Sequence, residues 1–127
     1  MKIDITPVAK PRMVRSDKWA KRPAVLRYWA FADELRLKYP KPLPEAVQIA
    51  FYLPMPDSWS EKKKVLMNGK PHKQKPDLDN LVKATLDSLS KQDSNIYRIH
   101  ASKWHSYQGV IEINEINGKG IEKVACG

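Results

Sequence analysis

Residues 75 to 89 read Lys-Pro-Asp-Leu-Asp-Asn-Leu-Val-Lys-Ala-Thr-Leu-Asp-Ser-Leu, and their spacing predicts the helix on which the fold is organised. Pro76 precedes the pattern and a polar run from residue 88 to residue 95 follows it, so the helix is expected to span roughly residues 77 to 90. Apolar side chains recur three or four positions apart, as in a helix with one buried face, at Leu78, Leu81, Val82, Leu86 and Leu89, and Thr85 fills the i+7 position of the same face.

Charged residues of this helix fall outside the buried stripe. At about 100° per residue, Asp79, Lys83 and Asp87 lie in a row beside the apolar face, so they face something other than the core. Asp77 lies where the helix begins. Two carboxylates at a helix start, with a lysine one turn later, suit a site that holds Mg²⁺ against a phosphate, because Mg²⁺ prefers oxygen ligands.

The same residues also have a purely structural interpretation. Asp77 is an ordinary N-cap residue after a proline, and Asp79 in the first turn complements the helix dipole. The row of Asp79, Lys83 and Asp87 then forms an i, i+4 ladder of ion pairs on the helix surface. The motif alone therefore does not choose between structure and catalysis.

The charge of the whole chain favours an anionic partner. Lys and Arg number 23 against 14 Asp and Glu, a formal net charge of +9. The excess gathers in residues 10 to 22 and 62 to 75. Trp19 lies in the first run and Trp59 precedes the second, and each either stacks on a base beside lysines or serves as a core or loop-anchoring residue. Acids clustered within a basic protein are what a metal-dependent enzyme acting on phosphodiesters needs. The residues expected to bind nucleic acid are Lys10, Arg12, Arg15, Lys18, Lys70, Lys73 and Lys75.

Length and composition indicate one domain, spanning residues 1 to 127, that is able to bury a core. The sequence has no apolar stretch of about 20 residues, and its start reads as a strand, so we expect a soluble cytoplasmic protein with no membrane partner. Cys126 has no second cysteine to pair with. His72, His100 and His105 are not spaced as metal ligands, and we expect surface or strand-edge positions for them.

The remaining patterns predict an α+β fold with a small mixed sheet of about four strands and two main helices. The last two strands are expected to form a hairpin around Tyr107-Gln108-Gly109, and residues 117 to 127 a loose tail. Beyond the central helix, the predicted elements are strands at residues 3–5, 47–53, 96–100 and 110–116, a helix at 24–39 and a short helix at 58–67 capped by Ser58 or Ser60.

The order of these elements, together with the central motif, resembles the RusA family of Holliday junction resolvases, endodeoxyribonucleases common in phages and prophages. The motif from Lys75 to Leu89 joins a basic residue and Asp-x-Asp-Asn to a lysine four positions after the second Asp and to a further Asp-x-Leu. The lysine-rich approach, the flanking strand-helix-strand order and the expected terminal hairpin also agree, so the resemblance covers residues 1 to 116. It implies a homodimer that binds four-way DNA junctions and resolves them with Mg²⁺ by paired symmetric nicks.

The resemblance also implies roles for individual residues. The two carboxylates of the signature correspond to Asp77 and Asp79, metal-site acids in the family, and the motif lysine corresponds to Lys83, which is needed for cleavage. A third family acid lies just before the next strand, where Asp93 fits, although the connection is shorter here than in many members. Asp87 also matches the signature, and we expect it to form a structural ion pair.

Other functions stay open on the sequence alone. A basic nucleic-acid-binding phage protein without catalysis would use the same lysines and aromatic residues. A structural or assembly protein would carry the charge only for solubility. A metal nuclease without junction preference would share the whole motif. The sequence does not choose between Mg²⁺ and Mn²⁺, and it does not show a cleavage-site preference.

Overall fold

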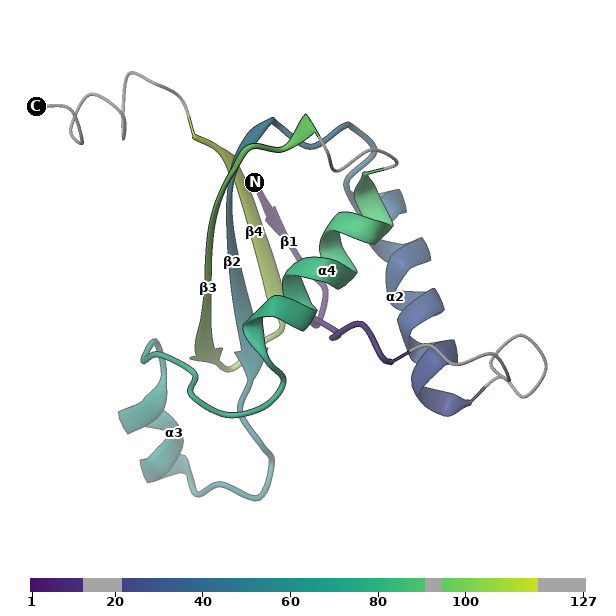
Figure 1. Ribbon diagram of the computed structural model, residues 1–127. Helices are drawn as coiled ribbons and strands as arrows, with labels where there is room; N and C mark the ends of the chain where they lie inside the picture. Colours follow the sequence, from purple (N-terminus) through teal and green to yellow (C-terminus); the bar gives the residue numbers. More distant parts are fainter. Residues whose placement is uncertain (13–21, 91–94, 117–127) are drawn as a thin grey trace, which may run out of the picture.

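Four strands form one mixed sheet in the order β1-β4-β2-β3 within residues 1–12, 22–90 and 95–116, the part of the chain that the computed structural model describes (Figure 1). The predicted α+β fold is therefore confirmed. The strands are β1 (Lys2–Ile3), β2 (Ala46–Pro54), β3 (Arg98–Ser106) and β4 (Val110–Glu115).

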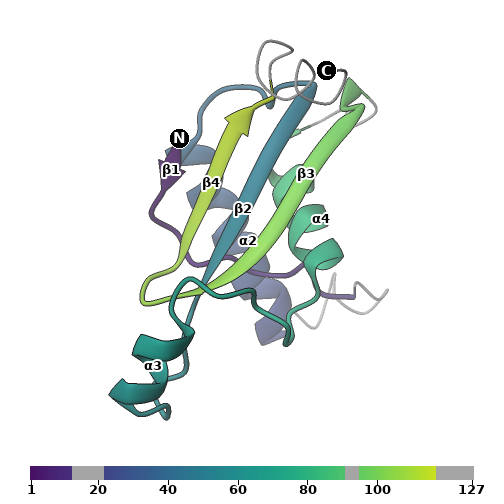
Figure 2. The ribbon, with the colours of Figure 1, turned by 90° about the vertical axis from the view of Figure 1, so that its left-hand side faces the viewer.

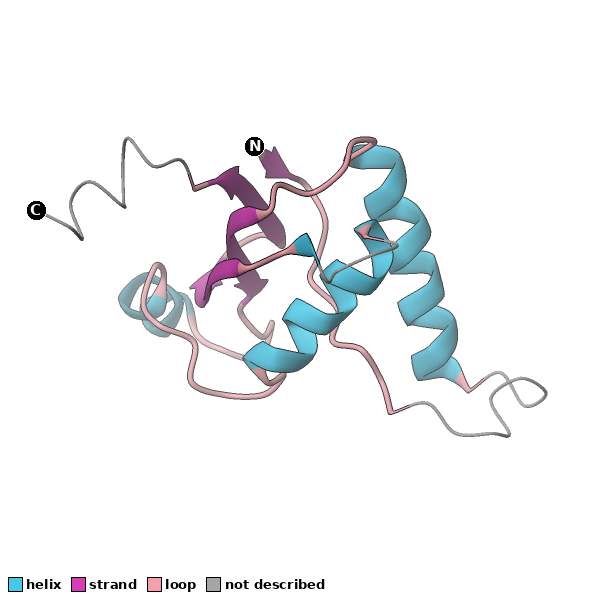
Figure 3. Ribbon diagram, turned by 45° about the horizontal axis from the view of Figure 1, so that its top comes forward, coloured by secondary structure: helices cyan, strands magenta, loops and turns pink. Residues whose placement is uncertain are grey.

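Two long helices, α2 (Pro23–Lys38) and α4 (Leu78–Leu89), cover one face of the sheet. Figure 3 shows both on the same side of the strands, and Figure 2 shows the opposite face with no helix over it. The short helix α3 (Glu61–Met67) projects beyond one end of the sheet (Figure 1). Its predicted cap is confirmed at Ser60, whose Oγ accepts a hydrogen bond from the Lys63 backbone N–H at 3.2 Å.

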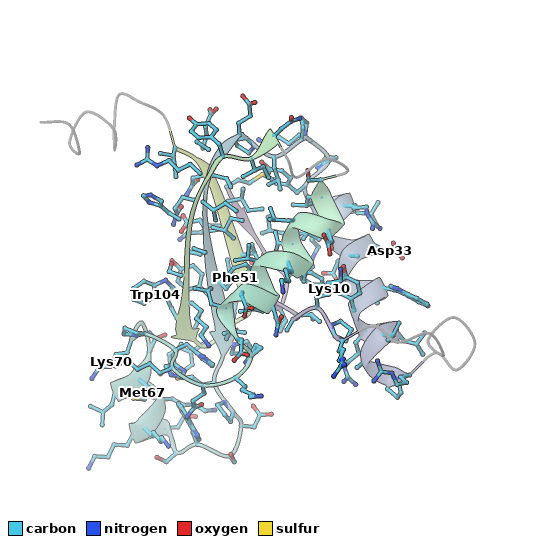
Figure 4. The ribbon with its side chains drawn as sticks, in the orientation of Figure 1. Lys10, Asp33, Phe51, Met67, Lys70 and Trp104 are labelled. Carbon is cyan, nitrogen blue, oxygen red and sulfur yellow. The ribbon has the colours of Figure 1, made fainter. Side chains whose placement is uncertain are left out.

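The core lies between β2 and the two long helices. Alternate residues of β2 face the helices. One of them, Phe51, is fully buried together with Leu35 of α2 and Leu81 of α4. Burying side chains of this size contributes about 1.5–3 kcal/mol each to the stability of the fold. Figure 4 shows Phe51 on the strand beside α4.

The buried face of α4 differs from the predicted one. Leu81 and Thr85 are buried as expected, but Leu86 and Leu89 are only partly buried. The other buried positions are Ala84 and Ser88, and these small side chains, with that of Thr85, let α2 pack closely against α4. The Thr85 and Ser88 hydroxyls donate to the backbone carbonyls of the residues four positions earlier, at 3.0 and 2.6 Å, so their burial leaves no donor unpaired.

The predicted hairpin of the last two strands is wrong. β2 lies between them, parallel to β3 and antiparallel to β4, and residues 107 to 109 pass over the end of β2. β2 carries the most apolar surface of the four strands, and the central position buries it best, which outweighs the local turn signal. Gly109 sits in this crossing, where an added Cβ would lie 2.4 Å from the Thr6 Oγ1, so a side chain does not fit there.

The two sides of the molecule differ in polarity. On the helix-free face of the sheet, Asn114 donates to the Gln48 side chain at 3.0 Å, and Tyr52 donates to Glu112 at 3.4 Å. The outer side of α2 is mixed: it carries the exposed ion pairs Arg36–Asp33 and Lys38–Glu34 together with three exposed large apolar side chains. Leu26 and Trp29 are 46% and 40% exposed and Leu37 is 81% exposed.

Candidate active site

The start of α4 presents two carboxylates to solvent. Asp77 is the N-cap, with φ −69° and ψ 141°, and its carbonyl accepts from the Leu81 N–H at 3.2 Å. The predicted cap is therefore made by the backbone, whereas the Asp77 carboxylate forms no capping hydrogen bond. Asp79 follows in the first turn, and both side chains are exposed. Within residues 1–12, 22–90 and 95–116 neither carboxylate has a hydrogen bond or an ion pair, so their oxygens are available to a cation.

The charged row along α4 is exposed as predicted, but the ladder within the helix is not formed. Asp87 pairs instead with the ammonium of Lys10, and this hydrogen bond raises the pKa of Lys10. Both partners are about a third exposed, so the pair contributes at most about 1 kcal/mol. The expected ion-pair role of Asp87 is thus confirmed with a different partner, and Lys83 has no ion pair among the described residues.

A basic hollow lies beside the first turns of α4. It has a volume of about 360 Å³ and is lined by Lys10, Pro11, Arg12, Asn80 and Lys83. The N-terminal segment is held there because the Lys10 backbone N–H donates to the Asn80 carbonyl at 3.1 Å. Figure 4 shows Lys10 beside α4. Two residues expected to bind DNA therefore share one hollow with the motif lysine. The candidates Arg15, Lys18 and Asp93 lie outside the described residues.

The segment from residue 69 to residue 76 is fixed along the edge of the sheet. Gly69 N–H donates to the His105 carbonyl at 2.9 Å, His105 N–H donates to the Lys70 carbonyl at 3.0 Å, and His72 N–H donates to the Lys103 carbonyl at 3.1 Å. Part of the free edge of β3 is paired in this way, and Lys70, Lys73 and Lys75 are all exposed on the segment. The second basic run thus leads directly to Asp77, at the same end of α4 as the hollow.

Lys103 is a residue of this site that the sequence analysis missed. Its ammonium donates to the carbonyls of Gln74 and Pro76, the latter at 2.7 Å. Lys103 pairs in register with Phe51, so it lies on the helix-facing side of β3. A lysine at an inward position of a strand is the signal that points to it, but the predicted strand ended at His100 and left Lys103 in a loop.

Comparison with protein families gives an independent identification. Residues 4 to 115 match the model of the family described as endodeoxyribonuclease RusA. The chain belongs to the RusA family. It is therefore an endodeoxyribonuclease of the junction-resolvase kind, and the resemblance seen in the motif is confirmed. The comparison with curated proteins found no significant match. None of the described helices is long and apolar enough to cross a membrane.

The donor atoms at the start of α4 fit the divalent cation expected of a RusA-family nuclease. Two exposed carboxylates without other partners provide the oxygen ligands that Mg²⁺ prefers, and the ion commonly keeps several waters besides its protein ligands. No group of three His, Cys, Asp or Glu side chains that could hold a metal is found among the described residues. Asp93, the expected third ligand, is outside them, so Asp77 and Asp79 are the candidate ligands that the described part of the chain supplies.

A pair of histidines joins the edge segment to β3 in this RusA-family chain. The rings of His72 and His105 lie 4.5 Å apart between centroids, and Trp59 packs on His105 at 5.4 Å. Both Nδ1 atoms are buried without a hydrogen-bond partner in the described part of the chain. Burial is the largest cause that lowers the pKa of both imidazoles. The pKa of His72 is lowered further by the charges of His105 and Lys103, and the pKa of His105 by those of Lys103 and Lys63.

We expect the stability of the protein to decrease as the pH falls below about 6.5, the ordinary pKa of histidine. The unfolded chain then binds protons that His72 and His105 bind less readily in the fold, so this contribution is complete above that pH and is lost as the pH falls through the lowered pKa values. Thermal unfolding of His72→Gln should depend less on pH than that of wild type, and His100→Gln, on the exposed part of β3, is the control. Identical pH profiles for wild type and His72→Gln would contradict the prediction.

Proposed function

We propose that the protein resolves four-way DNA junctions by Mg²⁺-dependent hydrolysis of phosphodiesters, with one nick made by each subunit of a homodimer. The observation that carries the proposal is the combination on α4 of two unpaired carboxylates with a basic hollow that includes Lys83. If these charges only stabilised the helix, Lys83 would be expected to take part in the ion-pair ladder along it. Among the described residues Lys83 forms no ion pair, and it lines the hollow together with Lys10 and Arg12.

The acids and the lysine have separate tasks in this proposal. Asp77 and Asp79 hold the cation, with Asp93 as the further ligand. Mg²⁺ when bound supplies charge that stabilises the phosphate oxygens and the leaving oxygen, and it lowers the pKa of water. Lys83 lies one turn beyond Asp79 and lines the hollow, so its ammonium can stabilise charge that develops on the scissile phosphate.

The two basic runs provide the path for the DNA backbone. Lys10 and Arg12 reach the start of α4 from one segment, and Lys70, Lys73 and Lys75 reach it along the edge of β3. Arg15 and Lys18 continue the first run. Binding through phosphates alone reads no sequence, so this path suits recognition of a branched structure, and binding should weaken steeply with salt.

Asp79→Asn should abolish nicking while junction binding stays intact. The substitution removes the charge that holds the cation but keeps the side-chain size, and several kcal/mol of transition-state stabilisation depend on the cation, so we expect a loss of more than about 100-fold. Affinity without metal should stay the same or rise, because one repulsion with the phosphates is gone. A denaturing gel measures nicking of a synthetic junction, and a gel shift in EDTA measures binding.

Asp87→Asn is the matched control for this experiment. Asp87 lies on the same exposed side of α4, but it pairs with Lys10 and is not a proposed ligand. Nicking by Asp87→Asn should remain close to that of wild type. Wild-type rates in Asp79→Asn would remove Asp79 from the site.

Lys83→Ala should lower the single-turnover cleavage rate by about 100-fold with little change in junction affinity, as expected for loss of one group that stabilises developing charge. Lys83→Arg should restore only part of the rate, because guanidinium is a planar fork and not a point charge. Thermal unfolding should hardly change, since the side chain is exposed. A variant that binds DNA poorly but cleaves normally at saturating protein would show that Lys83 is only a phosphate contact.

Paired nicks need two sites related by two-fold symmetry, so the free protein should sediment as a dimer at micromolar concentration. The outer side of α2, with the exposed apolar side chains Leu26, Trp29 and Leu37, is the surface we expect the subunits to share. Leu37→Lys should shift the protein toward monomer, whereas Leu66→Lys on α3, also an exposed leucine, should not. A wild-type monomer that stays monomeric on the junction would favour a nuclease without paired cleavage.

A further inference from the structure

Lys103 connects the edge of the sheet to the start of α4 at two points. Its carbonyl accepts from the His72 N–H at 3.1 Å, and its side chain donates to the carbonyls of Gln74 and Pro76. The two side-chain contacts, to Gln74 and Pro76, join residues 29 and 27 positions apart in the chain, so they depend on the tertiary fold. The segment that precedes Asp77 is therefore held by one strand residue.

The ammonium of Lys103 donates its hydrogen bonds to the backbone. Among the described residues it has no carboxylate partner, and its acceptors are the two carbonyls. Lys103 is partly buried, in register with Phe51, so its stem passes beside the core before the ammonium reaches the segment. A charged group in such a position is costly to place unless it forms hydrogen bonds, and here the ammonium donates to two carbonyls next to the proposed ligands.

The Pro76 carbonyl belongs to the peptide bond that enters Asp77. A donor that fixes this carbonyl also fixes the plane of the peptide bond. This restrains the direction in which the Asp77 side chain extends from the backbone. Asp77 has no capping hydrogen bond of its own side chain, so this end of α4 lacks the usual local restraint on the residue. The Lys103 ammonium supplies a restraint from outside the helix.

We propose that Lys103 is a positioning residue that orients Asp77 and Asp79 for metal binding. The inference rests on the proposed function of these acids and adds the group that holds them. Lys103 acts through the backbone and touches neither the cation nor the DNA. Its loss should weaken metal binding by the folded protein, because outer hydrogen bonds that orient ligands typically contribute about 10- to 100-fold to metal affinity.

The test compares Lys103→Met with wild type. Methionine keeps a long apolar stem but cannot donate to the carbonyls. Mn²⁺ binding to the protein without DNA, followed by calorimetry, should weaken by about tenfold or more, and the Mg²⁺ concentration for half-maximal nicking should rise by a similar factor. Junction affinity in EDTA should stay close to that of wild type, because Lys103 does not touch the DNA in this proposal. Lys103→Arg, which keeps charge and donors, should recover part of the Mn²⁺ affinity.

Lys2→Met is the control, since Lys2 is an exposed strand lysine on β1 that has no part in the proposed site. Unchanged Mn²⁺ affinity in a folded Lys103→Met protein would overturn the positioning role, and so would a loss of junction affinity in EDTA with normal metal binding, which would make Lys103 a DNA contact. Failure of both Lys103→Met and Lys103→Arg to fold would make it a determinant of stability and overturn the role as well. A wild-type protein that neither binds Mn²⁺ nor nicks would instead refute the proposed metal site itself.

Discussion

The packing of α4 against β2 and α2 is the constraint on which the candidate site depends. Leu81 and Ala84 are fully buried in the core, and this fixes the rotation of the helix about its axis. The opposite side, with Asp79 and Lys83, must then face solvent. Apolar burial in the core thus sets the direction in which the charged groups of the site point, although none of those groups contributes to the core.

The edge of β3 provides the second half of the arrangement. An edge strand exposes backbone donors and acceptors, and here residues 69 to 72 satisfy several of them. The pairing also carries the exposed Lys70 to the end of the sheet where the following residues enter α4. One structural requirement, the protection of an edge, therefore brings positive charge to the carboxylates at the helix start. This explains why a segment with no regular structure of its own leads to the site with a defined path.

The start of α4 was predictable because its signals are local. Pro76, the spacing of Leu78 and Leu81, and the acids at the first turn lie within one short run, and the helix begins at the expected residue. The contacts of Lys103 could not be predicted in the same way. β3 is a half-buried edge strand, so its second half lacks the apolar alternation by which a strand is recognised, and the prediction stopped at His100.

The order of the strands required information that no local pattern holds. The connection at residues 107 to 109 was correctly located. Its residues do not reveal that β2 lies between β3 and β4, the two strands that this connection joins. That choice depends on which strand has the most apolar surface to bury, a comparison across the whole chain. The partner of Asp87 is a similar case, because Lys10 reaches it only through the packing of the N-terminal segment against α4.

The distribution of charge links DNA binding to the cation. In a chain of net charge +9, Asp77 and Asp79 are acids without basic partners in the described residues, whereas Asp87 is neutralised by Lys10. A phosphate that enters the hollow beside Lys83 meets attraction from the basic residues and repulsion from these two carboxylates. A divalent cation bound by the two carboxylates would neutralise their charge and so remove that repulsion. In the proposed function, the lysines would therefore bring the DNA to the protein, and the cation would let the scissile phosphate approach the acids.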